Sequence, residues 1–89
     1  AFAQRSDSGL LLTWNRVTAP SGFAVLRYRV EYYDSAAASW IEAGTAESLS
    51  SSFAVSGSSL TRGRSYTLRV AAITSVGVGN FKVSNAVTY

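Results

Sequence analysis

Apolar and polar residues alternate with a period of two along residues 10–14, 28–33 and 66–73. Successive side chains of a β-strand point to opposite faces, so each stretch predicts a strand with one apolar row facing a core. Shorter strands are expected at residues 1–5, 40–43, 52–55 and 83–89. In the first of these, Phe2 is expected to be the inward anchor.

Glycine, serine and proline cluster between the predicted strands, where they favour turns, and no stretch has the length of a stable helix. Six or seven short strands without helices indicate an all-β sandwich. A chain of 89 residues has room for one domain, so we interpret residues 1–89 as a single domain. The inward positions predict this core: Leu10, Leu12, Trp14, Tyr28, Val30, Tyr32, Leu60, Tyr66, Leu68 and Val70.

Three segments together resemble a fibronectin type III domain over essentially the whole chain. They are residues 10–14, which end in Trp14, residues 28–32, and residues 60–72, in which a Leu and a turn glycine precede Tyr66. The resemblance implies a seven-stranded antiparallel sandwich of immunoglobulin-like topology. It also implies that Tyr66 forms a tyrosine corner, with its hydroxyl bonded to upstream backbone. Two departures are Arg62, where the family commonly has proline, and a first strand without its usual proline.

The residue types needed for most enzyme chemistry are missing. The sequence has no histidine and no cysteine, so the common nucleophile–base pairs and most transition-metal ligand sets cannot be built. Its acidic residues are scattered over outward or turn positions rather than paired. The glycines of residues 77–79 lack the third glycine and the helix of a phosphate-binding loop. We expect no catalysis, no metal and no cofactor.

Charge and hydropathy narrow the partners. The net charge is +3, from eight basic and five acidic residues, with no concentrated basic run, which argues against nucleic-acid binding. The longest apolar run, residues 70–73, is far too short for membrane insertion. An apolar fraction of 47% supplies a core without disulfides. We expect the isolated domain to be monomeric.

The resemblance implies that two loops meet at one end of the sandwich. Their apolar residues could form a contact patch for a protein partner or a neighbouring module of the same chain. The alternative is that Val25 and one valine cap the core, since single exposed apolar residues are common. The candidate contact residues are Phe23, Val25, Val76, Val78 and Phe81.

Arginines provide a second candidate surface. Arg27 and Arg29 alternate outward on one predicted strand and Arg69 on another, and these strands are neighbours in the family. Such a stripe could bind a sulfated glycan or another polyanion. The alternative is a solvated face in which Glu31 pairs with the arginines. The Arg-Gly-Asp tripeptide of some family members is absent.

The leading functional hypothesis is a non-catalytic protein-interaction or adhesion module of a larger multidomain protein, either extracellular or on the cell surface. The family also has intracellular members, and the lack of cysteine leaves that location open as an alternative. A passive spacer in a multidomain secreted enzyme is the alternative. A weaker alternative is a polyanion-binding module that uses the three arginines.

Overall fold

The computed structural model describes residues 1–15, 25–48, 50–75 and 77–89. Within them lie eight strands and one short 3-10 helix, η1. Their bounds are β1 (Phe2–Ser6), β2 (Gly9–Thr13), β3 (Val25–Asp34), β4 (Ser39–Glu47), β5 (Ser52–Ser56), η1 (Gly57–Ser59), β6 (Ser65–Thr74), β7 (Gly77–Val78) and β8 (Lys82–Thr88).

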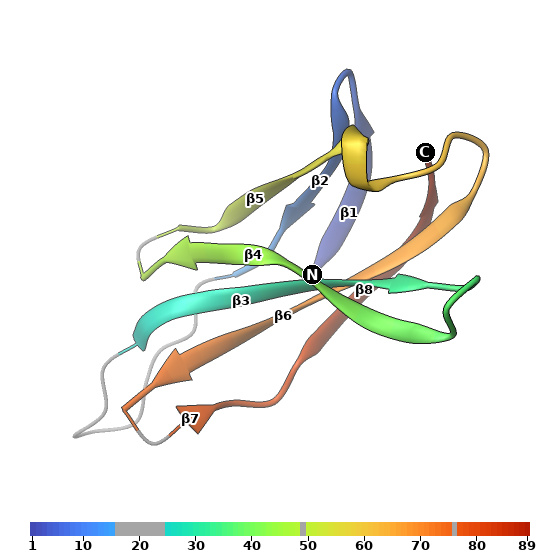
Figure 1. Ribbon diagram of the computed structural model, residues 1–89. Coiled ribbons are helices and arrows are strands. Elements are labelled where there is room, and N and C mark those ends of the chain that lie inside the picture. The colour runs from blue at the N-terminus through green and yellow to red at the C-terminus, as the bar shows by residue number, and fades with distance from the viewer. Residues whose placement is uncertain (16–24, 49, 76) are drawn as a thin grey trace.

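The strands form two sheets that face each other (Figure 1). One sheet has three strands in the order β1-β2-β5. The other has five, in the order β4-β3-β6-β7, with β8 also paired to β6. All strand pairs are antiparallel, which confirms the predicted antiparallel β-sandwich. The one strand beyond the seven predicted is the two-residue β7. It lies in a segment predicted as a loop and pairs with the end of β6.

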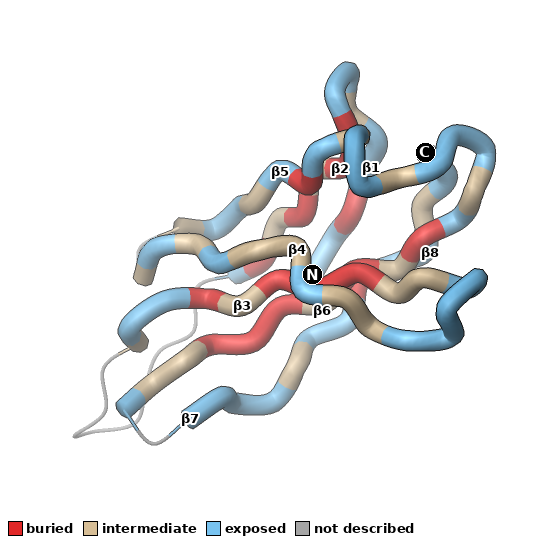
Figure 2. Tube along the Cα trace, in the orientation of Figure 1, coloured by how far each residue is buried: buried red, intermediate tan, exposed pale blue. Residues whose placement is uncertain are grey.

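The core lies between the inner faces of the two sheets, as the buried segments of β2, β3 and β6 show (Figure 2). The rings of Trp14 and Tyr28 pack with centroids 5.3 Å apart. Tyr32 and Tyr66 meet edge to face at 5.8 Å. Nine of the ten predicted core residues are buried, and the tenth, Leu60, is partly buried against them.

Strand β1 shows one error of the sequence prediction. Phe2 is 55% exposed, whereas its neighbour Ala3 is buried. The register explains the difference, because Ala3 lies opposite Leu12 and residues directly opposite each other share a face. Leu12 faces the core, so Ala3 must do so too, and Phe2 must face outward. The inward anchor of β1 is therefore Ala3.

The tyrosine corner implied by the resemblance is present. Tyr66 is buried, and its hydroxyl accepts a hydrogen bond from the backbone N–H of Thr61 at 2.7 Å. This bond holds the connection from η1 against the start of β6.

The two ends of the chain lie at different levels along the sheets. Ala1 and Val25, the first residue of β3, line the same cavity. Tyr89 donates its backbone N–H to the carbonyl of Arg64, whose side chain contacts Asp34 at the other end of β3. Ala3 is hydrogen-bonded to Asn85 in the middle of β8, so Ala1 and Tyr89 are separated by less than the length of β3.

Candidate protein-interaction face

The outer surface of the five-stranded sheet gathers aromatic and charged side chains, and we call it the outer β3–β6 face. In β3, Arg29, Glu31 and Tyr33 alternate with buried residues and therefore point outward. The register places Trp40 opposite Tyr33 and Arg69 opposite Glu31. Side chains from β3, β4 and β6 thus meet on one surface.

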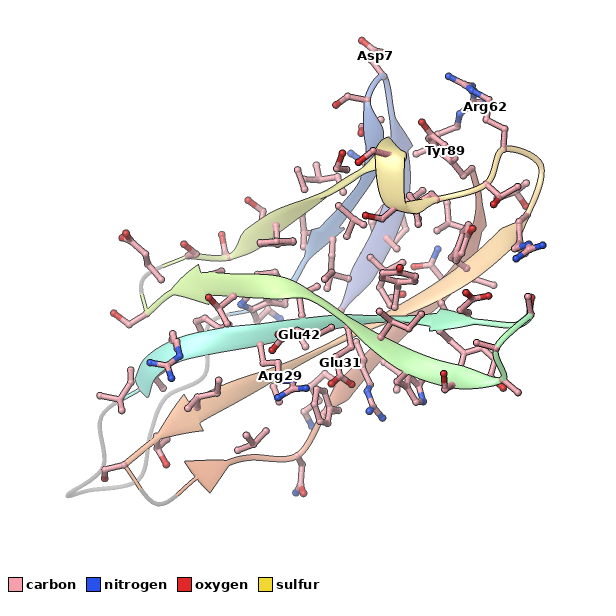
Figure 3. All side chains as sticks on the ribbon, in the orientation of Figure 1. Asp7, Arg29, Glu31, Glu42, Arg62 and Tyr89 are labelled. Atoms are coloured by element: carbon pink, nitrogen blue, oxygen red, sulfur yellow. The ribbon has the colours of Figure 1, made fainter. Side chains whose placement is uncertain are left out.

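Glu31 is at the centre of this face. Its side chain is only 8% exposed, although it points away from the core. Arg69 donates from Nε to Oε1 at 2.7 Å, and its Nη2 lies 2.5 Å from the same oxygen. Arg29 donates from Nε to Oε2 at 2.9 Å, and this nitrogen also lies 3.4 Å from Glu42. Figure 3 shows Arg29, Glu31 and Glu42 directed toward one another. Both carboxylate oxygens are therefore satisfied by guanidinium groups, which is what a buried charge requires.

The Arg69 guanidinium is enclosed by two aromatic rings. Its central carbon lies 4.1 Å from the ring centroid of Trp40 and 4.0 Å from that of Phe81. Tyr33 contacts Trp40 edge to face, with ring centroids 5.4 Å apart. Cation–π attraction strengthens when the cation is partly desolvated, and the Arg69 side chain is only 24% exposed. The stack Tyr33–Trp40–Arg69–Phe81 therefore ties β4 and the segment before β8 to the centre of the sheet.

The structure describes three of the five predicted contact residues, because Phe23 and Val76 lie outside the described residues. Val25 packs against the core cluster. Phe81 stacks on Arg69, which points outward. These two residues therefore lie on opposite sides of the five-stranded sheet and do not form one patch. Val78 is 50% exposed and pairs with Ile73 at the sheet margin.

A third apolar residue joins Val78 and Phe81 at this margin. Val83 of β8 lies opposite Arg69 and is 55% exposed. With Val78 and Phe81 it forms what we call the apolar margin of the face. Sequence analysis did not include Val83 or Trp40 in a binding surface. The sequence could have indicated Val83, because the alternation along its strand places this apolar residue at an outward position.

The predicted arginine stripe is present, but its charges are paired. Strands β3 and β6 are neighbours, as the resemblance implied. Arg29 and Arg69 share Glu31, and Glu42 lies beside Arg29, so these four groups carry no net charge. Arg27 is exposed and has no ion pair with any described residue. Polyanion binding stays a prediction, and two of its three arginines already have carboxylate partners.

Other parts of the described surface give no candidate binding site. A cavity of about 550 Å³ opens beside Val25 and Trp14. Its lining includes Asn15 and Val25, and residues 16–24 between them are outside the described residues, so we assign no site to it. Within residues 1–15, 25–48, 50–75 and 77–89, no group of three or more acidic side chains could hold a metal ion. The same ranges contain no helix with the length and hydropathy to cross a membrane.

Comparison with known proteins identifies the family. A family model described as "Fibronectin type III domain" matches residues 1–88. The chain belongs to the fibronectin type III family. No curated protein sequence matches it.

Solved structures of this fold give the same result. The twitchin kinase region from C. elegans aligns with a TM-score of 0.78 and 20% identity over 93% of this chain. Domains A168–A170 of titin align with a TM-score of 0.77 and 24% identity over 97% of this chain. The sixth fibronectin type III domain of human fibronectin type III domain containing protein 3 aligns with a TM-score of 0.64 and 27% identity over 94% of this chain. This chain spans 14%, 30% and 74% of the lengths of those three chains.

Proposed function

We propose that this fibronectin type III chain is a non-catalytic protein-interaction module of a larger multidomain protein, located outside the cell or on its surface. The outer β3–β6 face is its contact surface. The observation that carries the proposal is the stack of Tyr33, Trp40, Arg69 and Phe81 beside the exposed Val78 and Val83.

The chemistry of this face suits protein recognition. Tyrosine, tryptophan and arginine are the residue types that dominate binding energy at protein interfaces. Here the stack and the Glu31 ion pairs already hold these side chains in place. Binding then costs less side-chain entropy than it would with free rotamers. The neighbouring apolar margin supplies area that a partner can remove from water.

A role within a multidomain protein has two supports. Members of the family occur in multidomain proteins such as titin and twitchin. In addition, Asn85 joins β8 to Ala3 of β1, so both ends of the chain lie along this junction of the two sheets, where a neighbouring module can follow without covering the centre of the outer β3–β6 face. The absence of histidine and cysteine supports the non-catalytic part.

The experiment screens a displayed library of cell-surface ectodomains against the labelled domain. Each binder is then measured with the double variant Val78→Ser/Val83→Ser. The matched control is Phe2→Ser, which removes an equally exposed apolar side chain from the opposite sheet. We expect a binder that tolerates the control and loses affinity with the double variant. If no ectodomain binds, or if both variants bind equally well, the passive-spacer alternative replaces the proposal.

A further inference from the structure

We propose that the outer β3–β6 face binds an extended acidic peptide segment with two carboxylates on alternate residues and an aliphatic side chain beside them. The inference rests on the proposed function, because it names the partner chemistry of the same face.

The charged groups of this face lie at different depths. Arg29, Arg69, Glu31 and Glu42 sum to zero, but they are not equally accessible. The Glu31 side chain is 8% exposed, whereas Arg29 is 37% exposed. Both Glu31 oxygens are occupied by arginine nitrogens. Over β3 a partner therefore meets guanidinium groups with Glu31 beneath them, whereas the second acidic group, Glu42, is 49% exposed and lies beside Arg29 on β4.

Two arginines of this face have unused hydrogen-bonding capacity. Arg29 uses only its Nε, and among the described residues neither of its terminal nitrogens forms a hydrogen bond. Arg27 is exposed, and it too has no hydrogen bond to a described side chain. A guanidinium fork binds a carboxylate through two parallel hydrogen bonds. The face therefore offers two open carboxylate sites.

The spacing of the two arginines matches that of an extended peptide. Arg27 and Arg29 are two residues apart on one strand, so they project from the same side roughly 6.6 Å apart. An extended peptide presents side chains on one side at the same repeat. Two carboxylates separated by one residue therefore match the two arginines in register, whereas adjacent carboxylates point to opposite sides.

The apolar margin on one side and two glutamates of β4 on the other determine the direction in which the peptide crosses the face. The register runs from Arg27 to Ile73 and on to Val78, so Val78 lies two strand spacings, about 10 Å, from Arg27. An aliphatic side chain that reaches across β6 would cover Val78. On the other margin, Glu42 and Glu47 of β4 are exposed and repel an acidic ligand. The peptide is thereby directed toward β6 and β7.

The test uses short synthetic peptides with two aspartates separated by one residue and one nearby leucine. Control peptides replace the aspartates with asparagine, place them side by side, or replace leucine with serine. Affinity is measured by calorimetry, and the site is mapped by NMR amide shifts. We expect Arg27→Gln and Arg29→Gln each to weaken binding about tenfold, the cost of one charged hydrogen-bonded contact. Arg5→Gln, an exposed control on β1, should change it less than about twofold.

Glu42→Gln gives a gain-of-affinity test. It removes the exposed carboxylate beside Arg29, so the aspartate peptide should bind more tightly while the asparagine peptide does not change.

Two outcomes would overturn the inference. One is that no aspartate peptide binds the outer β3–β6 face. The other is that a heparin-derived oligosaccharide binds more tightly and peptide spacing has no effect, which would assign the arginines to polyanions. In either case, an ectodomain that binds through Val78 and Val83 would leave the proposed function standing.

Discussion

Asn85 binds the backbone of Ala3 twice, across nearly the whole length of the sequence. Its amide oxygen accepts the Ala3 N–H at 2.9 Å, and its amide nitrogen donates to the Ala3 carbonyl at 3.0 Å. Strands β1 and β8 belong to different sheets, so this side chain takes the place of a ladder between them. It also occupies backbone groups at a strand edge, where free N–H and C=O groups invite pairing with other chains.

Replacing Asn85 should remove the hydrogen bonds that hold β1 against β8. We expect Asn85→Ala to lower the free energy of unfolding by about 2 kcal/mol, because two partly buried hydrogen bonds are lost. Urea titration measures this change, and the amide of Ala3 should exchange its hydrogen faster. The control is Asn80→Ala, at an exposed position. Unchanged exchange at Ala3 would mean that β2 alone holds β1.

Removing the Tyr66 hydroxyl tests the corner. In Tyr66→Phe the Thr61 N–H loses its acceptor while the buried ring remains. We expect a loss of about 1.5 kcal/mol in the free energy of unfolding. The matched control is Tyr33→Phe, because among the described residues the Tyr33 hydroxyl has no hydrogen bond. Equal effects of the two substitutions would contradict a special role for the corner.

Arg69 should stabilise the fold through its planar guanidinium group as well as through its charge. Arg69→Ala leaves Glu31 buried with Arg29 as its remaining guanidinium partner, and we expect a loss of about 3 kcal/mol in unfolding free energy. Arg69→Lys keeps the charge but cannot stack a planar group between Trp40 and Phe81. It should therefore recover only part of the loss. Full recovery by lysine would show that the aromatic stack adds nothing to stability.

The sequence predicted the core well because strand geometry alone sets its phase. Leu10 and Leu12 must share a face once residues 10–14 form a strand, whatever the strand pairs with. Phe2 was misplaced for the complementary reason. In a short edge strand, the partner register decides which side chain points inward, and local hydrophobicity does not.

Strand β4 shows a second limit. The prediction covered residues 40–43, but the strand runs from Ser39 to Glu47. The register shifts between Val30 and Glu31, so Ala43 has no direct partner there and the alternation along β4 changes phase. Gly44, at φ 152°, lies at this irregularity. A period-two pattern cannot be followed across a bulge, so the second half of β4 was not predicted.

The candidate face depends on contacts between distant segments. The position of Glu31 and its pairing with arginine were foreseen, because cross-strand neighbours were implied by the resemblance. The Trp40–Arg69–Phe81 stack was not, because it requires the β3–β4 register and the path after β7 together. Period-two reasoning assigns a face to each residue but does not place one strand's side chains over another's.

Alkaline pH should weaken the fold through Tyr32. Burial raises the pKa of Tyr32 above 10.0, with added effects from the nearby Asp34 and Tyr66. Because the folded-state pKa is above the unfolded one, the native state holds this proton more tightly. The resulting stabilisation is fully present below pH 10 and is lost as pH rises through the folded-state pKa. Denaturant titrations between pH 8 and 12 should therefore show a decline that begins near the unfolded pKa of about 10. In Tyr32→Phe no phenol ionises at this position, and the decline should be shallower. An identical pH dependence in that variant would assign the alkaline loss to other tyrosines.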